Sequence, residues 1–330
     1  MKAIKILTMA ALATAVFTSC SNEDELAQSN YPMDNVVRIM TSVDGMNTRA
    51  SYGNSTAKLS SFGFCINNAG SAKYTYDNIK VTKEGSNWIP AIQMLWQNST
   101  TAVDILAYAP YQETTEDASG KVKVFGKTDY AFSVKEDQSN AEDYSSDLIV
   151  YKKTGFKPES DLNTNQAVDV TFTHLLSQLN LTIELRDQFN QDEKKPVTSA
   201  TVTDVKVDGT FIRSKVNFAA DPISVQIGGT QVPKAITPET VAFTKADKTT
   251  DHATFKYSAI VIPQWIRAGV FCISFKVNGN DYIWTSTSDV NFVSGKKHDL
   301  HLLVGKDVVQ GGAISAKPWG EETITEKETD

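Results

Sequence analysis

The chain has 330 residues, of which 22% are charged and 41% hydrophobic, a balance typical of globular proteins with room for two ordinary domains. Its formal net charge is −7, and it has no cluster of lysines or arginines. Nucleic acid and anionic lipid are therefore poor candidates as partners, because both are bound by basic patches.

The first twenty residues have the features of an export signal. Lys2 and Lys5 precede an apolar run over residues 6–17, which is too short to span a bilayer. Phe17-Thr18-Ser19-Cys20 then matches a lipobox, although Phe17 stands where leucine is usual. A buried N-terminal helix is the alternative, and the polar, acidic residues 21–29 argue against it. We predict a signal peptide over residues 1–20 and a lipid anchor that carries palmitate on Cys20.

One β-strand is predicted between this signal and the main body of the chain. Over residues 36–43 apolar and polar side chains alternate, which places Val37, Ile39 and Val43 on one face. A polar segment follows and contains Arg49, in a stretch suited to exposure.

Short alternating runs separated by turn residues occupy the rest of the chain. Such strands, with turns every 8–15 residues, indicate antiparallel β-sandwiches, and no amphipathic pattern lasts for three helical turns. The polar stretch 154–166 is the best candidate boundary between two domains, 50–165 and 166–330. Strands are expected at 59–66, 74–81, 92–96, 102–109, 121–124, 130–134, 147–151, 168–185, 200–207, 223–227, 255–262, 270–277, 282–285 and 298–304.

The stretch around Phe172 contains a change of strand parity. Apolar residues alternate on even numbers up to Phe172 and on odd numbers from Leu179, so one regular strand with one buried face cannot include both. A bulge or a single helical turn is expected between them. His174 lies at this point, and we expect it to bond a local backbone group, with a ligand or catalytic role as the alternative.

No catalytic or metal-binding pattern stands out. His298 and His301 are three residues apart on an expected strand, so their side chains should point to opposite faces and not share a metal ion. Cys65 and Cys272 each lie in an apolar strand and are expected to be buried free thiols rather than a disulfide. We therefore predict no enzyme activity, no cofactor and no metal. Tryptophans are expected in the core or at strand edges, and an exposed one that stacks on a sugar is the alternative.

Several short motifs, in order, resemble those of the fimbrillin (Mfa-like, FimA-like) family of type V pilus subunits from Bacteroidetes. They are Phe-x-His-x-Leu-x-x-Leu-x-Leu from Phe172, Ala107-Tyr108-Ala109-Pro110, Ser146-Asp147-Leu148-Ile149, Ile260-Val261-Ile262-Pro263-Gln264, Ser294-Gly295-Lys296-Lys297-His298 and the segment from Ile314 to Trp319. His298 stands where the family usually has tyrosine. The acidic residues after Cys20 also resemble a signal for outward display.

The resemblance implies a fold and a way of assembling. It implies two tandem transthyretin-like antiparallel β-sandwich (Greek-key) domains, and a propeptide, residues 21–49, that an Arg-specific protease removes by cutting between Arg49 and Ala50. Loss of the strand at Val37, Ile39 and Val43 would open a groove for a strand donated by another subunit. The candidate donor is segment 308–324, in which Val308, Ile314 and Ala316 share a parity, although Gly311-Gly312 and Pro318 interrupt it.

Two functions are therefore expected as alternatives. The first is a pilus (fimbrium) subunit that assembles by protease-triggered strand exchange and supports cell adhesion. Its partners would be identical or different pilus subunits, the Arg-specific protease and the outer membrane. The second is a surface lipoprotein that does not polymerise and binds a glycan or a host protein.

Overall fold

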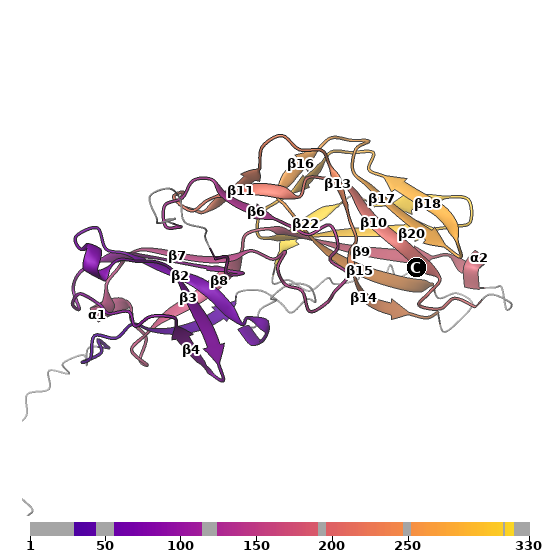
Figure 1. Ribbon diagram of the computed structural model, residues 1–330. Helices are drawn as coiled ribbons and strands as arrows, with labels where there is room; N and C mark the ends of the chain where they lie inside the picture. The colour runs from indigo at the N-terminus through magenta and orange to yellow at the C-terminus, as the bar shows by residue number, and fades with distance from the viewer. Residues whose placement is uncertain are drawn as a thin grey trace, which may run out of the picture.

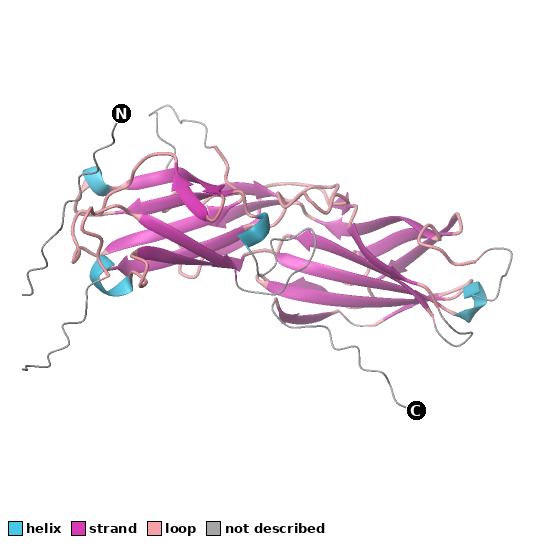
Figure 2. Cartoon of the chain, turned by 90° about the horizontal axis from the view of Figure 1, so that it is seen from below, coloured by secondary structure: helices cyan, strands magenta, loops and turns pink. Residues whose placement is uncertain are grey.

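In the computed structural model the alternating apolar runs form β-strands, which confirms the predicted all-β class. The structure describes residues 30–43, 56–113, 124–190, 196–246, 252–312 and 314–319. Two lobes built from strands lie end to end (Figure 1), and helices are single turns at their edges (Figure 2). The α-helices are α1 (Pro158–Asp161) and α2 (Asp187–Asn190), and no helix in the described ranges is long and apolar enough to cross a membrane.

The N-terminal lobe is formed by one seven-stranded sheet. Its first strand, β1, pairs in parallel with β8, and the other neighbouring strands are antiparallel. The two end strands, β1 and β4, line the same groove, so the sheet curls round on itself. In spatial order the strands are β1 (Arg38–Val43), β8 (Ala167–His174), β7 (Ile149–Phe156), β5 (Val103–Ala109), β2 (Ser61–Asn67), β3 (Tyr76–Glu84) and β4 (Asn87–Pro90).

The C-terminal lobe is formed by two larger sheets and two small ones. One larger sheet has the order β13 (Lys234–Ile236), β10 (Val202–Thr210), β17 (Cys272–Val277), β18 (Asn280–Thr285). The other has the order β14 (Glu239–Thr244), β15 (Ala253–Val261), β9 (Ser177–Leu185), β20 (Lys296–Val304), β21 (Val309–Gly311), and β22 (Ser315–Pro318) also pairs with β20. One small sheet has the order β12 (Ser224–Ile227), β11 (Arg213–Asn217), β6 (Tyr130–Ser133). The other consists of β16 (Gln264–Ile266) and β19 (Val290–Phe292).

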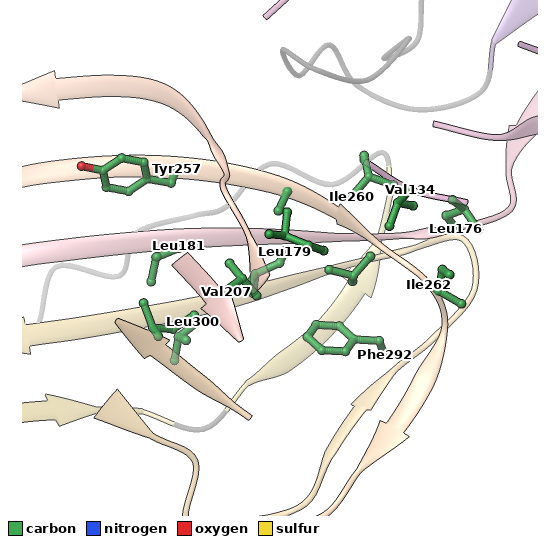
Figure 3. Packing of buried hydrophobic residues seen from close by; sticks show 14 of the residues in the cluster. Val134, Leu176, Leu179, Leu181, Val207, Tyr257, Ile260, Ile262, Phe292 and Leu300 are labelled. Atoms are coloured by element: carbon green, nitrogen blue, oxygen red, sulfur yellow. The ribbon is translucent and has the colours of Figure 1, made fainter. Parts of the chain in front are cut away.

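A continuous apolar core fills the C-terminal lobe. Leu179 and Leu181 of β9 face Val207 of β10 and Phe292 of β19, and all four side chains are at most 1% exposed (Figure 3). Ile183 and Leu185 continue this inward face of β9, while Asn180, Thr182 and Glu184 face outward. The alternation read in the sequence thus sets which face of β9 is buried.

The chain passes from one lobe to the other immediately after His174. β8 lies in the N-terminal sheet and β9 in the C-terminal lobe, with only Leu175 and Leu176 between them. The parity change therefore marks a step between two sheets, and neither a bulge within one strand nor a helical turn is needed. The polar stretch that suggested a boundary at residue 165 instead connects β7 to its neighbour β8, so the first lobe extends to residue 174.

Residues from the first half of the chain also build part of the second lobe. β6 pairs with β11 of the C-terminal lobe (Figure 1). In addition, Lys152 of β7 donates hydrogen bonds to the carbonyl oxygens of Phe218, Ala219 and Ala220, at 3.0, 3.1 and 2.7 Å. These contacts fix the two lobes to each other.

The two cysteines in the described ranges are free thiols, as predicted. Cys65 is fully buried, and burial raises the pKa of its thiol well above the usual value. Cys272 is only half-buried, because it lies on the outward face of β17 together with Ser274 and Lys276, so the expectation that both are buried is wrong for this one.

Candidate functional site: the N-terminal edge strand and the C-terminal segment

The apolar face predicted for the N-terminal strand is buried. Val37, Ile39 and Val43 are 3%, 7% and 5% exposed and belong to the core of the N-terminal lobe. Met40, on the other face, is 43% exposed. The strand therefore covers part of the core while its polar face stays in solvent.

β1 is paired along one side, and the residues just before it are paired on the other side. From Arg38 to Val43 it pairs with Ala167 to Phe172 of β8. On its other side the Val37 N–H donates to the Met94 carbonyl oxygen at 3.0 Å, and the Trp96 N–H donates to the Asn35 carbonyl oxygen at 2.8 Å. Beyond this point β1 is an edge strand, and edge strands expose unpaired backbone groups that can pair with another strand.

An open groove of about 890 Å³ lies along the free side of β1. Its walls are β1 and β4, and Ile39, Met40, Trp88 and Ile89 contribute to its lining. Ile89 is 43% exposed, so apolar side chains are accessible on both walls. The groove is bordered by the two end strands of one sheet, which is where an added strand could find backbone partners.

The C-terminal segment lies on its own lobe. β21 and β22 pair antiparallel with the two ends of β20, at 302–304 and 296–299 respectively. The three predicted donor positions do not form one buried face in this arrangement: Val308 is 46% exposed, Ile314 is half-buried against the core and Ala316 is exposed.

Gly311, the first glycine of the interruption, has a packing reason. A Cβ atom at Gly311 would overlap the indole of Trp284 on β18 and crowd a methyl group of Leu302. Only glycine lets the backbone of β21 approach Trp284 this closely. The glycine that weakens the segment as a donor therefore helps to seat it on its own lobe.

Trp319 anchors the end of this segment at the junction between the lobes. Its side chain is 5% exposed, and its ring stacks on His174 with the ring centroids 3.9 Å apart and the planes 9° from parallel. His174 Nδ1 bonds Asp147 Oδ1 at 3.0 Å, and these two side chains are 1% and 0% exposed. The sequence suggested a local backbone partner for His174; the carboxylate that the structure places against it is 27 residues away, which no local pattern could reveal.

The other histidines lie in the C-terminal lobe. As predicted, β20 presents His298 and His301 on opposite faces: His298 is buried, while His301 faces outward and its Nε2 bonds Glu184 Oε2 at 2.7 Å. Burial lowers the pKa of His298, whose Nε2 accepts a hydrogen bond from the Val293 N–H. Hydrogen bonds from His301 and His252 lower the pKa of Glu184 to about 2, and the bond to Glu184 raises the pKa of His301.

In the part of the chain that the structure describes, no three histidine, cysteine, aspartate or glutamate side chains are grouped to hold a metal ion. Among the tryptophans of that part, Trp265 on β16 is the exposed one, at 54%, with the Arg267 guanidinium 5.9 Å from its ring centre. Cys20, Arg49 and Ala50, the predicted lipidation and cleavage positions, lie outside the described residues.

Comparison with known proteins gives a family and a fold. The model of a family described as fimbrillin-like matches residues 48–319. A search of curated protein sequences finds no match. Among solved structures, a proposed cell adhesion protein from Bacteroides uniformis has 20% identity and a TM-score of 0.57, over 87% of this chain and 99% of that one. A proposed cell adhesion protein from Bacteroides ovatus has 14% identity and a TM-score of 0.59, over the same shares. At these identities the likeness shows a shared fold.

Proposed function

The chain belongs to the fimbrillin-like family, and on that premise we propose that it is a structural subunit of a cell-surface pilus that supports adhesion. The observation that carries the proposal is β1, an apolar edge strand that covers the core of the N-terminal lobe and precedes Arg49 by a few residues. The proposed role is structural rather than catalytic.

We propose that subunits assemble by strand exchange, in which the acceptor site is the position that β1 occupies. An Arg-specific protease that cut between Arg49 and Ala50 would separate β1 from the rest of the chain. Once β1 left, β8 would have an unpaired edge along Ala167 to Phe172, and the core under Val37, Ile39 and Val43 would be uncovered. A strand from another subunit can satisfy both the backbone groups and the apolar surface.

The donor half is the C-terminal segment. Its pairing with β20 is limited to the short strands β21 and β22. Val308 and Ala316 are already exposed, so little apolar burial holds these positions in place. If the segment left its own lobe, Val308, Ile314 and Ala316 could together face the groove of a neighbouring subunit.

Surface attachment completes the proposal. Lipidation of Cys20 would hold the unprocessed chain at the outer membrane, and cleavage after Arg49 would release the mature subunit from its anchor. Arg38 is a less suitable cleavage point, because it lies within β1 and pairs with Asp34 at 2.6 Å.

The test starts from a chain of residues 21–330 treated with an Arg-specific protease, followed by intact mass and an unboiled denaturing gel. We expect a product that begins at Ala50 and a regular ladder of oligomers. An Arg49→Lys chain keeps the charge and should stay uncut and monomeric. A chain truncated after Val304 should be cut but form no ladder. If the product beginning at Ala50 remains monomeric, strand exchange is refuted; if Arg49 is not cut, the processing step is refuted.

Trp265 favours the second candidate function, recognition of a glycan or a host protein. An exposed indole beside a guanidinium offers an aromatic face to a sugar ring. Binding to immobilised glycans should then fall on Trp265→Ala and be unchanged on Trp284→Phe. If the Trp265→Ala chain bound the glycans as well as the parent chain, this second function would be refuted.

A further inference from the structure

Trp319 is the most deeply buried part of the C-terminal segment. Among the side chains described from Val309 to Trp319, Trp319 alone is buried, whereas Gln310, Ala316 and Pro318 are exposed. The stacking partner of Trp319 is His174. The end of the segment is thus fixed by an aromatic contact in addition to the short ladder of β22.

Trp319 packs against His174 of the N-terminal lobe, and we call His174, together with the Asp147 that bonds it, the seat of Trp319. His174 is the last residue of β8, and Asp147, which bonds its imidazole, lies two residues before β7. His174 also pairs with Ile149, the first residue of β7. A residue near the end of the chain therefore rests on the ends of two strands from the first lobe, at the junction where Figure 1 places β22.

The strand that carries this seat is also the strand that holds β1. The two ladders of β8 are of unequal length: β1 pairs with Ala167 to Phe172, and β7 pairs only with Thr173 and His174. Without β1, β8 would keep its sheet pairing only at Thr173 and at His174, the residue on which Trp319 stacks. Fraying of β8 from its first residue would then reach the seat, and the orientation of the imidazole would become less well defined.

We propose that the Trp319–His174 stack is a clasp that couples the two ends of the subunit. While β1 is in place, β8 is ordered and the clasp holds the C-terminal segment on its own lobe. When β1 leaves, the seat loosens and the segment is released. This inference rests on the proposed function, and it would ensure that a subunit frees its donor segment only after its own acceptor site has opened.

Thermodynamic coupling is reciprocal, which makes the clasp testable without any assembly. If loss of β1 weakens the hold on the C-terminal segment, loss of Trp319 must weaken the hold on β1 by the same factor. Couplings of this kind are roughly 5- to 150-fold in equilibrium constants.

The experiment compares two uncleaved chains, residues 21–318 and 21–319, which differ only in the presence of Trp319. Hydrogen exchange is followed for the amides of β1 and of β21 and β22. We expect faster exchange in the chain that ends at Pro318, at both places, by roughly 5- to 150-fold. Trp265→Ala, an exposed tryptophan on the same lobe, should change neither. The reverse test is Ile39→Ala, which should speed exchange in β22 as well as in β1.

Unchanged exchange in β1 when Trp319 is removed would overturn the coupling, even if β22 exchanged faster. Unchanged exchange at both places would overturn the clasp itself. The proposed function is judged separately by the ladder on the gel. Ladders without coupled exchange reject the clasp alone, whereas coupled exchange without ladders upholds the clasp and rejects strand-exchange assembly.

Discussion

Deletion of residues 1–49 should leave the N-terminal lobe close to unfolding. The deletion removes Val37, Ile39 and Val43, which are all at most 7% exposed. Burial of such side chains contributes roughly 1.5–3 kcal/mol each, so about 5–9 kcal/mol is lost. The free energy of unfolding of a typical domain is about 5–15 kcal/mol. The missing strand therefore accounts for a large part of the stability of the lobe, before the unpaired backbone of β8 is considered.

Urea unfolding followed by tryptophan fluorescence can measure this loss. Trp88 packs edge-on against Phe62 with the ring centroids 5.1 Å apart, and Trp96 stacks on Phe156 at 5.6 Å, so both report on the N-terminal lobe. In a chain that begins at Ala50 we expect an early transition from this lobe and a later one from the C-terminal lobe.

A peptide of residues 34–43 should restore the stability of the shortened chain. Its effect should grow with peptide concentration, because a ligand that binds only the folded form stabilises that form by mass action. The matched control is the same peptide with Ile39→Asp, which places a charge in the buried position. If the deletion costs less than about 1 kcal/mol, the scale of one ordinary substitution, then β1 does not support the lobe and the acceptor site is refuted.

Three further outcomes are expected. Gly63→Ala should lower the free energy of unfolding by about 1–3 kcal/mol, because the added methyl group overlaps the Tyr108 ring; a stability equal to that of the parent would show that the ring moves freely. Lys152→Met should lower it by about 1–3 kcal/mol by removing a cation from three carbonyl oxygens, and should separate the unfolding of the two lobes in a urea titration. The pair of Glu184 and His301 should contribute most to the free energy of unfolding between pH 4.5 and 6.5. Because the pKa of Glu184 is lowered, its contribution is lost as the pH falls towards about 2. Because the pKa of His301 is raised, its contribution is lost as the pH rises through that pKa. Glu184→Gln should therefore flatten stability against pH, and an unchanged pH profile would count against the pair.

Local sequence patterns determined most of the strands and the face that each one buries. The alternation in Val37, Ile39 and Val43 predicted a half-buried strand, and all three are buried. The same reasoning placed His298 and His301 on opposite faces of one strand. These features follow from a period of two along the chain, which is a property of the backbone and needs no knowledge of neighbouring elements.

Only the tertiary structure decided which strands pair and which distant side chains meet. β1 pairs in parallel with β8, about 130 positions away, and the polar stretch before β8 connects two neighbouring strands instead of separating two domains. His174 finds Asp147 and Trp319 because the ends of three strands converge at the junction of the lobes. Such contacts are set by sheet order and by the close packing of the core, which depend on the whole chain at once and leave no periodic trace in any one segment.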